Sequence, residues 1–197
     1  MVSIYLDAFT PEISGDKDSV GEFYFVTRSG MNSHRWPTEK ELKMEAGVTY
    51  DEVKNNLVKA YAQLSIGNPL DETNHVGPLI DKMAVEIYLA AIEKAKSEGG
   101  NVLVEGGVLN GAGHESGCYV KPVIIEAKNH YEIVQDETFA PILYIMKYSE
   151  MEEAIDLQNG VKQGLSSAIM TTNLRESERF LSAAGSDCGI ANVNIGT

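Results

Sequence analysis

The sequence predicts an α/β protein in which βαβ units build a parallel sheet. The last third of the 197-residue chain carries the prediction, because three segments rich in Val, Ile and other apolar residues, 141–148, 164–171 and 188–195, alternate with two segments of helical character. The links between these segments are short. Strands that alternate with helices over short links favour right-handed crossovers between parallel strands, with helices covering both faces of the sheet.

The first predicted helix covers residues 50–64. Thr49 and Glu52 have the spacing of a capping box, in which a side chain at each end satisfies a free backbone N–H of the first turn. Four apolar or aromatic residues recur at helical spacing: Val53, Leu57, Tyr61 and Leu64. The helix is expected to stop before Gly67.

A second helix is predicted over residues 81–97, ended by the pair Gly99 and Gly100. Its expected buried face consists of Ala84, Ile87, Ala91 and Ala95. Two segments rich in Val and Ile follow, 101–107 and 119–127, and both are predicted strands.

The helices of the last third each begin with a capping signature. Ser149 with Glu152 predicts the start of a helix over 151–160, and Asn173 with Glu176 predicts the start of a helix over 174–185.

Residues 1–47 lack a sustained period. The run at 21–27 favours a strand, but turn-forming residues surround it. An extension, a small hairpin and a disordered arm all remain open for this segment. The predicted organisation is therefore an N-terminal extension over 1–47 and an α/β lobe over 48–197.

Composition limits the partners. The chain holds 16 Lys plus Arg and 29 Asp plus Glu, a net charge of −13, which repels nucleic acid and anionic membrane surfaces. No apolar run is long enough to span a bilayer, and the N-terminus has no basic segment ahead of an apolar one, so a cytoplasmic protein is expected. The two cysteines, Cys118 and Cys188, form no CxxC motif.

The segment 135–141, with sequence QDETFAP, is the main candidate site. Side chains two residues apart lie on the same side of an extended segment, so Glu137 and Phe139 are expected to face one way. A carboxylate there can accept hydrogen bonds from a pair of ribose hydroxyls while the ring flanks a flat heterocycle. The alternative is a capped turn that leads into a strand, since acids near strand starts are more often solvated.

Several motifs in a fixed order resemble the second half of the aldehyde dehydrogenase superfamily, and most of all its antiquitin branch, the alpha-aminoadipic semialdehyde dehydrogenases. The resemblance extends from about residue 49 to residue 197. The matching segments are GNPLDETNHVGPLID at 67–81, GCYVKPVII at 117–125, QDETFAPILYI at 135–145, VKQGLSSAIMTTN at 161–173 and GSDCGIANVNIG at 185–196.

The resemblance implies a role for the candidate segment. In this family the acid of the matching E-x-F motif binds the ribose next to nicotinamide and the aromatic packs against that end of the cofactor, so Glu137 and Phe139 are the implied binding residues for NAD or NADP. Pro141 is implied to fix the turn into the strand. A structural role is implied for five further matches: Gly77, Pro78, Gly164, Asn192 and Asn194.

The implied reaction is oxidation of a semialdehyde to a carboxylate by NAD(P)+. Family members use a cysteine thiolate that adds to the carbonyl and a glutamate-activated water that hydrolyses the thioester. The matching position lies shortly before the first predicted helix, and segment 38–48 contains no cysteine. The sequence therefore predicts no catalytic residue in this chain, which resembles an enzyme segment cut at both ends and is expected to be inactive alone.

Neither of the cysteines that are present is expected to replace the nucleophile. Cys188 is the better placed, but the neighbouring Asp187 carboxylate disfavours a thiolate, and Cys118 lies in a loop or at a strand edge. The four histidines are isolated from one another and from the cysteines, so no metal site is predicted: His34, His75, His114 and His130.

Two alternatives to the enzyme remain from the sequence. One is a non-catalytic interaction module that docks on a second copy of the chain or on a full-length relative, through sheet surfaces left uncovered. The other is a gene remnant derived from the enzyme.

Overall fold

The computed structural model describes residues 2–6, 23–29 and 50–195, with side chains for 50–195. The described residues divide into two compact units. Unit 1 contains 2–6, 23–27, 50–55 and 145–195, and unit 2 contains 28–29 and 56–144. Helix α1 (Tyr50–Tyr61) and strand β7 (Ile142–Tyr148) run from one unit into the other.

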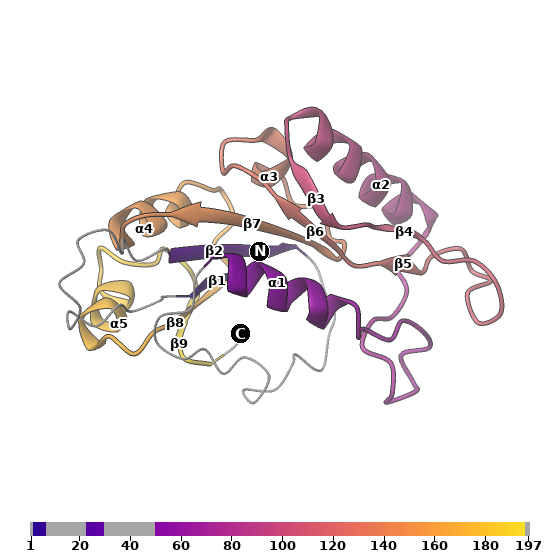
Figure 1. Ribbon diagram of the computed structural model, residues 1–197, viewed down its shortest axis with the longest axis horizontal. Coiled ribbons are helices and arrows are strands. Elements are labelled where there is room, and N and C mark those ends of the chain that lie inside the picture. Colours follow the sequence, from indigo (N-terminus) through magenta and orange to yellow (C-terminus); the bar gives the residue numbers. More distant parts are fainter. Residues whose placement is uncertain (1, 7–22, 30–49, 196–197) are drawn as a thin grey trace. The chain divides into compact units, whose positions relative to one another are not determined.

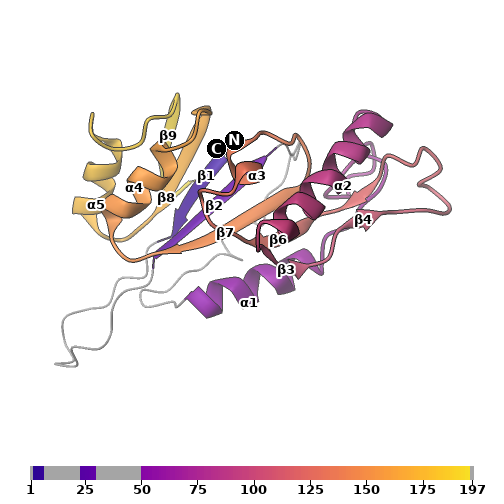
Figure 2. The same ribbon diagram turned by 90° about the horizontal axis from the view of Figure 1, so that it is seen from above.

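Unit 1 is an α/β unit with parallel strand pairs (Figures 1 and 2). Besides its share of α1, β7 and β2 (Phe23–Ser29), it contains β1 (Val2–Leu6), α4 (Met151–Asn159), β8 (Ser166–Met170), α5 (Leu174–Leu181) and β9 (Ile190–Val193). The strand order is β7-β2-β1-β8-β9. Strand β8 runs parallel to both β1 and β9, with Ser166 opposite Val2 and Ile190. The predicted parallel βαβ arrangement is thereby confirmed for β8, α5 and β9.

Two segments of the predicted N-terminal extension join this sheet as strands. Strand β2 covers most of the run at 21–27 that was predicted to be a strand, and β1 lies between β2 and β8. Strands β7 and β8 are therefore not neighbours, although they are consecutive in the last third of the chain. The rest of the segment 1–47 lies outside the described residues.

Of the three predicted capping boxes, one is confirmed, one is wrong and one lies outside the described residues. Asn173 caps α5, because its side chain accepts a hydrogen bond from the Arg175 N–H at 3.0 Å. For α4 the predicted box is wrong: the N-cap is Glu150, and the Ser149 N–H donates to the carboxylate of Glu153 at 2.8 Å. The cap predicted at Thr49 lies outside the described part of the chain.

Unit 2 combines a long helix with antiparallel strands. It contains α2 (Lys82–Ser97), β3 (Asn101–Val104), β4 (Gly107–Val108), β5 (Val120–Lys121), β6 (Val123–Glu126) and α3 (Glu132–Gln135). The strand order is β3-β6-β7, and the pairs β3–β6 and β4–β5 are antiparallel. The sequence predicts strands in the segments 101–107 and 119–127 without a pairing direction, and the structure shows that both pairs are antiparallel. The chain returns from β4 to β5 through a glycine-rich loop, without the crossover helix that a parallel pair needs.

Helix α2 has the predicted limits but a different buried face. Asp81 is its N-cap and accepts from the Ala84 N–H at 2.8 Å, and Gly99 after its end has a φ of +100°. Of the predicted face, Ala91 and Ala95 are buried but Ile87 is 49% exposed. The face that packs inward is Val85, Tyr88, Ala91, Ile92 and Ala95. The buried face is shifted around the helix, so that Tyr88 and Ile92 pack inward beside Ala91 and Ala95 while Ile87 is exposed.

No helix among the described residues combines the length and apolar character needed to cross a membrane.

Candidate functional site

The segment 136–141 connects α3 to β7 in unit 2. Its side chains alternate in exposure: Thr138 and Ala140 are buried, whereas Glu137 and Phe139 are exposed, Phe139 to 67%. The Glu137 carboxylate and the Phe139 ring are therefore both accessible to solvent.

Phe139 has an unusual backbone conformation. Its φ is +50°, in the left-handed region that L-residues with large side chains rarely adopt. A residue held there has a conformational cost that the surrounding structure must overcome, and such strain concentrates at ligand-binding and catalytic sites. The extended geometry assumed from the sequence does not hold at this residue. The Phe139 ring is mostly exposed, so the cost of this conformation is not offset by burial of the ring in the core.

Replacing Phe139 with glycine is expected to stabilise the chain relative to replacing it with alanine. Both variants lose the ring, but only glycine adopts a φ of +50° without steric cost, so the two should differ by about 1 kcal/mol in free energy of unfolding. Urea unfolding of the two variants measures the difference. Equal stabilities would contradict the left-handed conformation.

The ends of the segment are tied down by hydrogen bonds. The Val123 N–H donates to the Pro141 carbonyl at 3.0 Å, which joins the segment to the start of β6. On the other side, the Gln135 side-chain amide donates to the Asn129 carbonyl at 2.5 Å. These bonds hold the flanks of the segment while its alternate side chains face solvent.

The cysteines occupy different units. Cys118 belongs to unit 2, where its Sγ lies 3.6 Å from the Ser116 carbonyl in the loop before β5. Cys188 belongs to unit 1, before β9, and its Sγ lies 3.8 Å from the Gln158 amide nitrogen. Both thiols are free and partly buried.

Two of the described histidines form hydrogen bonds with the backbone of the segment that follows α1. The His75 ring accepts a hydrogen bond from the Ser65 N–H at 3.0 Å, and the His114 ring lies 3.1 Å from the Ile66 carbonyl. Within residues 50–195 no cluster of His, Cys, Asp and Glu side chains could hold a metal ion. His34 lies outside the described residues.

Some of the residues for which the resemblance implies a structural role lie where another residue type would clash or lose hydrogen bonds. A Cβ on Gly164, just before β8, would lie 2.7 Å from the Asp187 carbonyl oxygen. Asn194 has a φ of +57°, and its side chain accepts from the Thr171 N–H and donates to the Thr171 carbonyl, at 2.8 and 2.9 Å. Asn192 lies in β9 opposite Ala168. Gly77, before α2, has room for a side chain, since its nearest neighbour is Pro69 at 3.5 Å.

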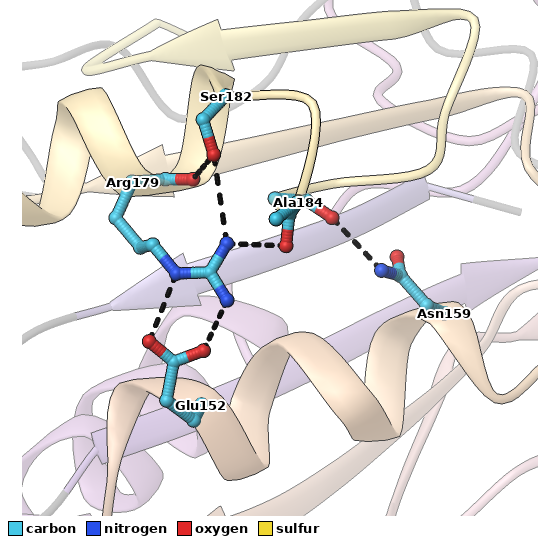
Figure 3. A network of polar contacts seen from close by, with 6 residues as sticks. Glu152, Asn159, Arg179, Ser182 and Ala184 are labelled. Carbon is cyan, nitrogen blue, oxygen red and sulfur yellow. Dashed lines mark hydrogen bonds and ion pairs between the residues drawn. The ribbon is translucent and has the colours of Figure 1, made fainter.

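A polar network that sequence reasoning missed joins α4 to α5 in unit 1. Figure 3 shows the Arg179 guanidinium between the Glu152 carboxylate and the Ala184 carbonyl. Its Nε donates to Glu152 Oε1 at 2.9 Å and its Nη2 donates to the other carboxylate oxygen. Hydrogen bonds from Arg179 lower the pKa of Glu152. A separation of 27 residues hides this pair from local pattern analysis.

The stability of unit 1 is expected to depend on the ionisation of Glu152 in acid. Because its folded-state pKa is lowered, the carboxylate stabilises the fold above the ordinary glutamate value of about 4.3, and this stabilisation is lost as the pH falls through the lowered pKa. Glu152→Gln should therefore lose less stability than the parent chain on acidification below that value. Urea unfolding over a pH series measures this, with Glu178→Gln on α5 as the control. Parallel pH profiles for parent and Glu152→Gln would contradict it.

Comparisons with known proteins bear on residues 45–197, which match the sequence profile of the aldehyde dehydrogenase family. The chain is 45% identical over 169 residues to alpha-aminoadipic semialdehyde dehydrogenase of Bos taurus, covering 85% of this chain and 30% of the relative. It is 41% identical over 173 residues to aldehyde dehydrogenase family 7 member A1 of Pisum sativum, covering 88% and 33%. The chain thus spans about a third of the length of the curated relatives it matches.

Solved structures give the same picture. A putative aldehyde dehydrogenase from Bacillus subtilis superposes with a TM-score of 0.65 at 37% identity, covering 74% of this chain and 30% of that one. The glyceraldehyde-3-phosphate dehydrogenase GapN from Methanocaldococcus jannaschii, solved with NADP, superposes with a TM-score of 0.64 at 33% identity, covering 75% and 30%.

Proposed function

Because this chain belongs to the aldehyde dehydrogenase family, we propose that its segment 136–141 forms the nicotinamide-ribose part of a cofactor site for NAD(P)+-dependent oxidation of a semialdehyde to a carboxylate. The observation that supports this most is the exposed pair of Glu137 and Phe139, with Phe139 held at a positive φ. The named substrate of the mammalian relatives, alpha-aminoadipic semialdehyde, favours a semialdehyde over a simple alkyl aldehyde.

The residues present fit the ribose end of a nicotinamide cofactor. An ionised carboxylate is an acceptor with two oxygens, so Glu137 can take hydrogen bonds from two adjacent hydroxyls. The ring of Phe139, two residues away, is also exposed and offers an apolar surface to that end of the ligand. When bound, the cofactor would supply the hydride acceptor for the oxidation.

The negative charge of segment 136–141 indicates which part of the cofactor it can contact. Asp136 and Glu137 are adjacent acids, and both are exposed. Two carboxylates repel phosphate, so we assign the segment the uncharged ribose and the flat ring, and not the pyrophosphate.

Calorimetric titration of the chain with NAD+, and separately with NADP+, tests the proposal. Glu137→Gln, which preserves the shape of the side chain but removes its charge, is expected to weaken binding roughly tenfold or more, since a hydrogen bond to a charged group contributes about 1.5–3 kcal/mol.

Asp136→Asn is the matched control, because it removes the same charge from the neighbouring exposed position. Its dissociation constant should stay within about twofold of the parent's, a change of less than 0.5 kcal/mol. Equal weakening by the two variants would indicate a general charge effect, and no binding of either nucleotide by the parent chain would reject the site.

A further inference from the structure

Glu98 links the end of α2 to the start of α3. It is the C-cap residue of α2, and its backbone N–H donates to the Lys94 carbonyl at 3.0 Å. Its carboxylate accepts hydrogen bonds from the first two N–H groups of α3, those of Glu132 at 3.1 Å and Ile133 at 3.3 Å. The side chain is only 15% exposed. One residue thus ends one helix and caps the next.

Lys94 reinforces this link. Its Nζ lies 3.4 Å from Glu98 Oε1 and 2.8 Å from Glu132 Oε2, so one ammonium group bridges the last turn of α2 and the first turn of α3. The hydrogen bond to Glu132, followed by that to Glu98, raises the pKa of Lys94. The two carboxylates and the ammonium form a connected set around the first turn of α3.

Helix α3 cannot hold its own position. It has four residues, far fewer than an isolated helix needs, so tertiary contacts must fix it. Those contacts include the buried Val134, the bonds to Glu98 and the ion pair of Lys94 with Glu132. Because α3 ends at Gln135, a shift of its first turn passes directly into the segment that carries Glu137.

Glu98 also affects the far side of the segment. Tyr144 on β7 is buried, and its hydroxyl has no hydrogen-bond partner among the described residues. Burial is the larger cause that raises the pKa of Tyr144, and the charge of Glu98 is the second. The contacts of the Glu98 carboxylate itself are with α2 and α3.

From these contacts we infer that Glu98 is a positioning residue for segment 136–141: by holding the first turn of α3 it sets where Glu137 and Phe139 stand. The expected effect of Glu98 on nucleotide binding rests on the proposed function. Its expected effect on the position of segment 136–141 does not. Glu98 acts through its bonds to α3, without touching the ligand itself.

Nucleotide binding tests the inference through a double-mutant cycle. Glu98→Ala should weaken NAD+ binding about tenfold, a typical coupling for residues that act through one network. In a Glu137→Gln background the same change should have a clearly smaller effect, because the charged contact of Glu137 is already lost and only the position of Phe139 still depends on Glu98. Additive losses in the cycle would overturn the inference. Glu98→Gln, which preserves one acceptor oxygen, should fall between the parent and Glu98→Ala and serves if the alanine variant does not fold.

Amide hydrogen exchange tests the same inference without a cofactor. In Glu98→Ala and Glu98→Gln, exchange should accelerate at 136–140 as well as at 132–133. Glu93→Ala is the matched control, because Glu93 lies on α2 but pairs with Lys96 at 3.1 Å. Faster exchange confined to 132–133 would mean that Glu98 only caps α3, and would overturn the inference. If the parent chain binds no nucleotide but exchange at 136–140 is faster in the Glu98 variants, the positioning role of Glu98 is upheld and the proposed cofactor site is rejected.

Discussion

Gly185→Ala is expected to destabilise unit 1 by about 3 kcal/mol, the upper part of the range for overpacking a rigid site. A Cβ at this position would meet the carbonyl oxygens of Phe180 and Arg179 and would lie 2.6 Å from the Phe180 carbonyl carbon. All three atoms belong to the backbone, which cannot rotate away as a side chain can.

The surrounding hydrogen bonds explain why Gly185 cannot shift. Its N–H donates to the Ser182 carbonyl at 2.8 Å, and the next N–H, that of Ser186, donates to the Phe180 carbonyl at 2.8 Å. Its own carbonyl accepts from the Asn159 side chain at 2.8 Å, a bond visible in Figure 3. Moving the loop to admit a methyl group would break these bonds.

Urea unfolding of Gly185→Ala against the parent chain measures the loss. Gly77→Ala is the matched control, since a Cβ there makes only ordinary contact with Pro69, at 3.5 Å. The control is expected to change stability by less than about 1 kcal/mol. A Gly185→Ala variant as stable as Gly77→Ala would show that the loop does not pass so close to the end of α5.

Tyr88→Phe is expected to destabilise unit 2 by about 1–3 kcal/mol, because it leaves two backbone groups without their partner. The Tyr88 hydroxyl donates to the Lys121 carbonyl at 2.5 Å and accepts from the Gly107 N–H at 3.0 Å. It thereby joins α2 to both strands of the β4–β5 pair. Burial raises the pKa of this tyrosine, so its hydroxyl keeps its proton and remains a donor at neutral pH.

The control for Tyr88→Phe is Tyr119→Phe. The Tyr119 ring makes an edge contact with His114, at 4.8 Å between ring centroids, and the described residues show no hydrogen bond to its hydroxyl. Its loss should leave the unfolding midpoint nearly unchanged. If both variants unfold at the same urea concentration, the bridge from Tyr88 to the β4–β5 pair does not contribute to stability.

Sequence patterns correctly predicted features that are set by residues close together in the chain, such as a helix cap and the strand segments. Asn173 caps α5 as its spacing from Glu176 indicates, and the β-rich segments of the last third form strands. The antiparallel pairing of β3 with β6 escaped prediction, because a strand's own residues do not encode the direction of its neighbour. The buried face of α2 escaped for a similar reason: Ile87 and Ile92 are equally apolar, and only the packing partner decides which turns inward.

For the candidate site as well, the sequence predicted local features and missed those that depend on distant residues. The spacing of Glu137 and Phe139 predicts that both side chains lie on one side, and the burial of Thr138 between them agrees. The positive φ of Phe139 has no sequence signal, since glycine and asparagine are the residues expected there. Glu98 was missed as well, because 34 residues separate it from the Glu132 N–H that it binds.

The place of β1 in the sheet has a consequence for biosynthesis. Val2 pairs with Ser166, so one edge of this strand stays open until the ribosome has made the chain between Val2 and Ser166 and β8 itself. Pairing between such distant segments is slow and leaves strand edges exposed in the meantime. Unit 1 is therefore expected to complete its sheet only after β8 has been synthesised, so β1 keeps an unpaired edge until then.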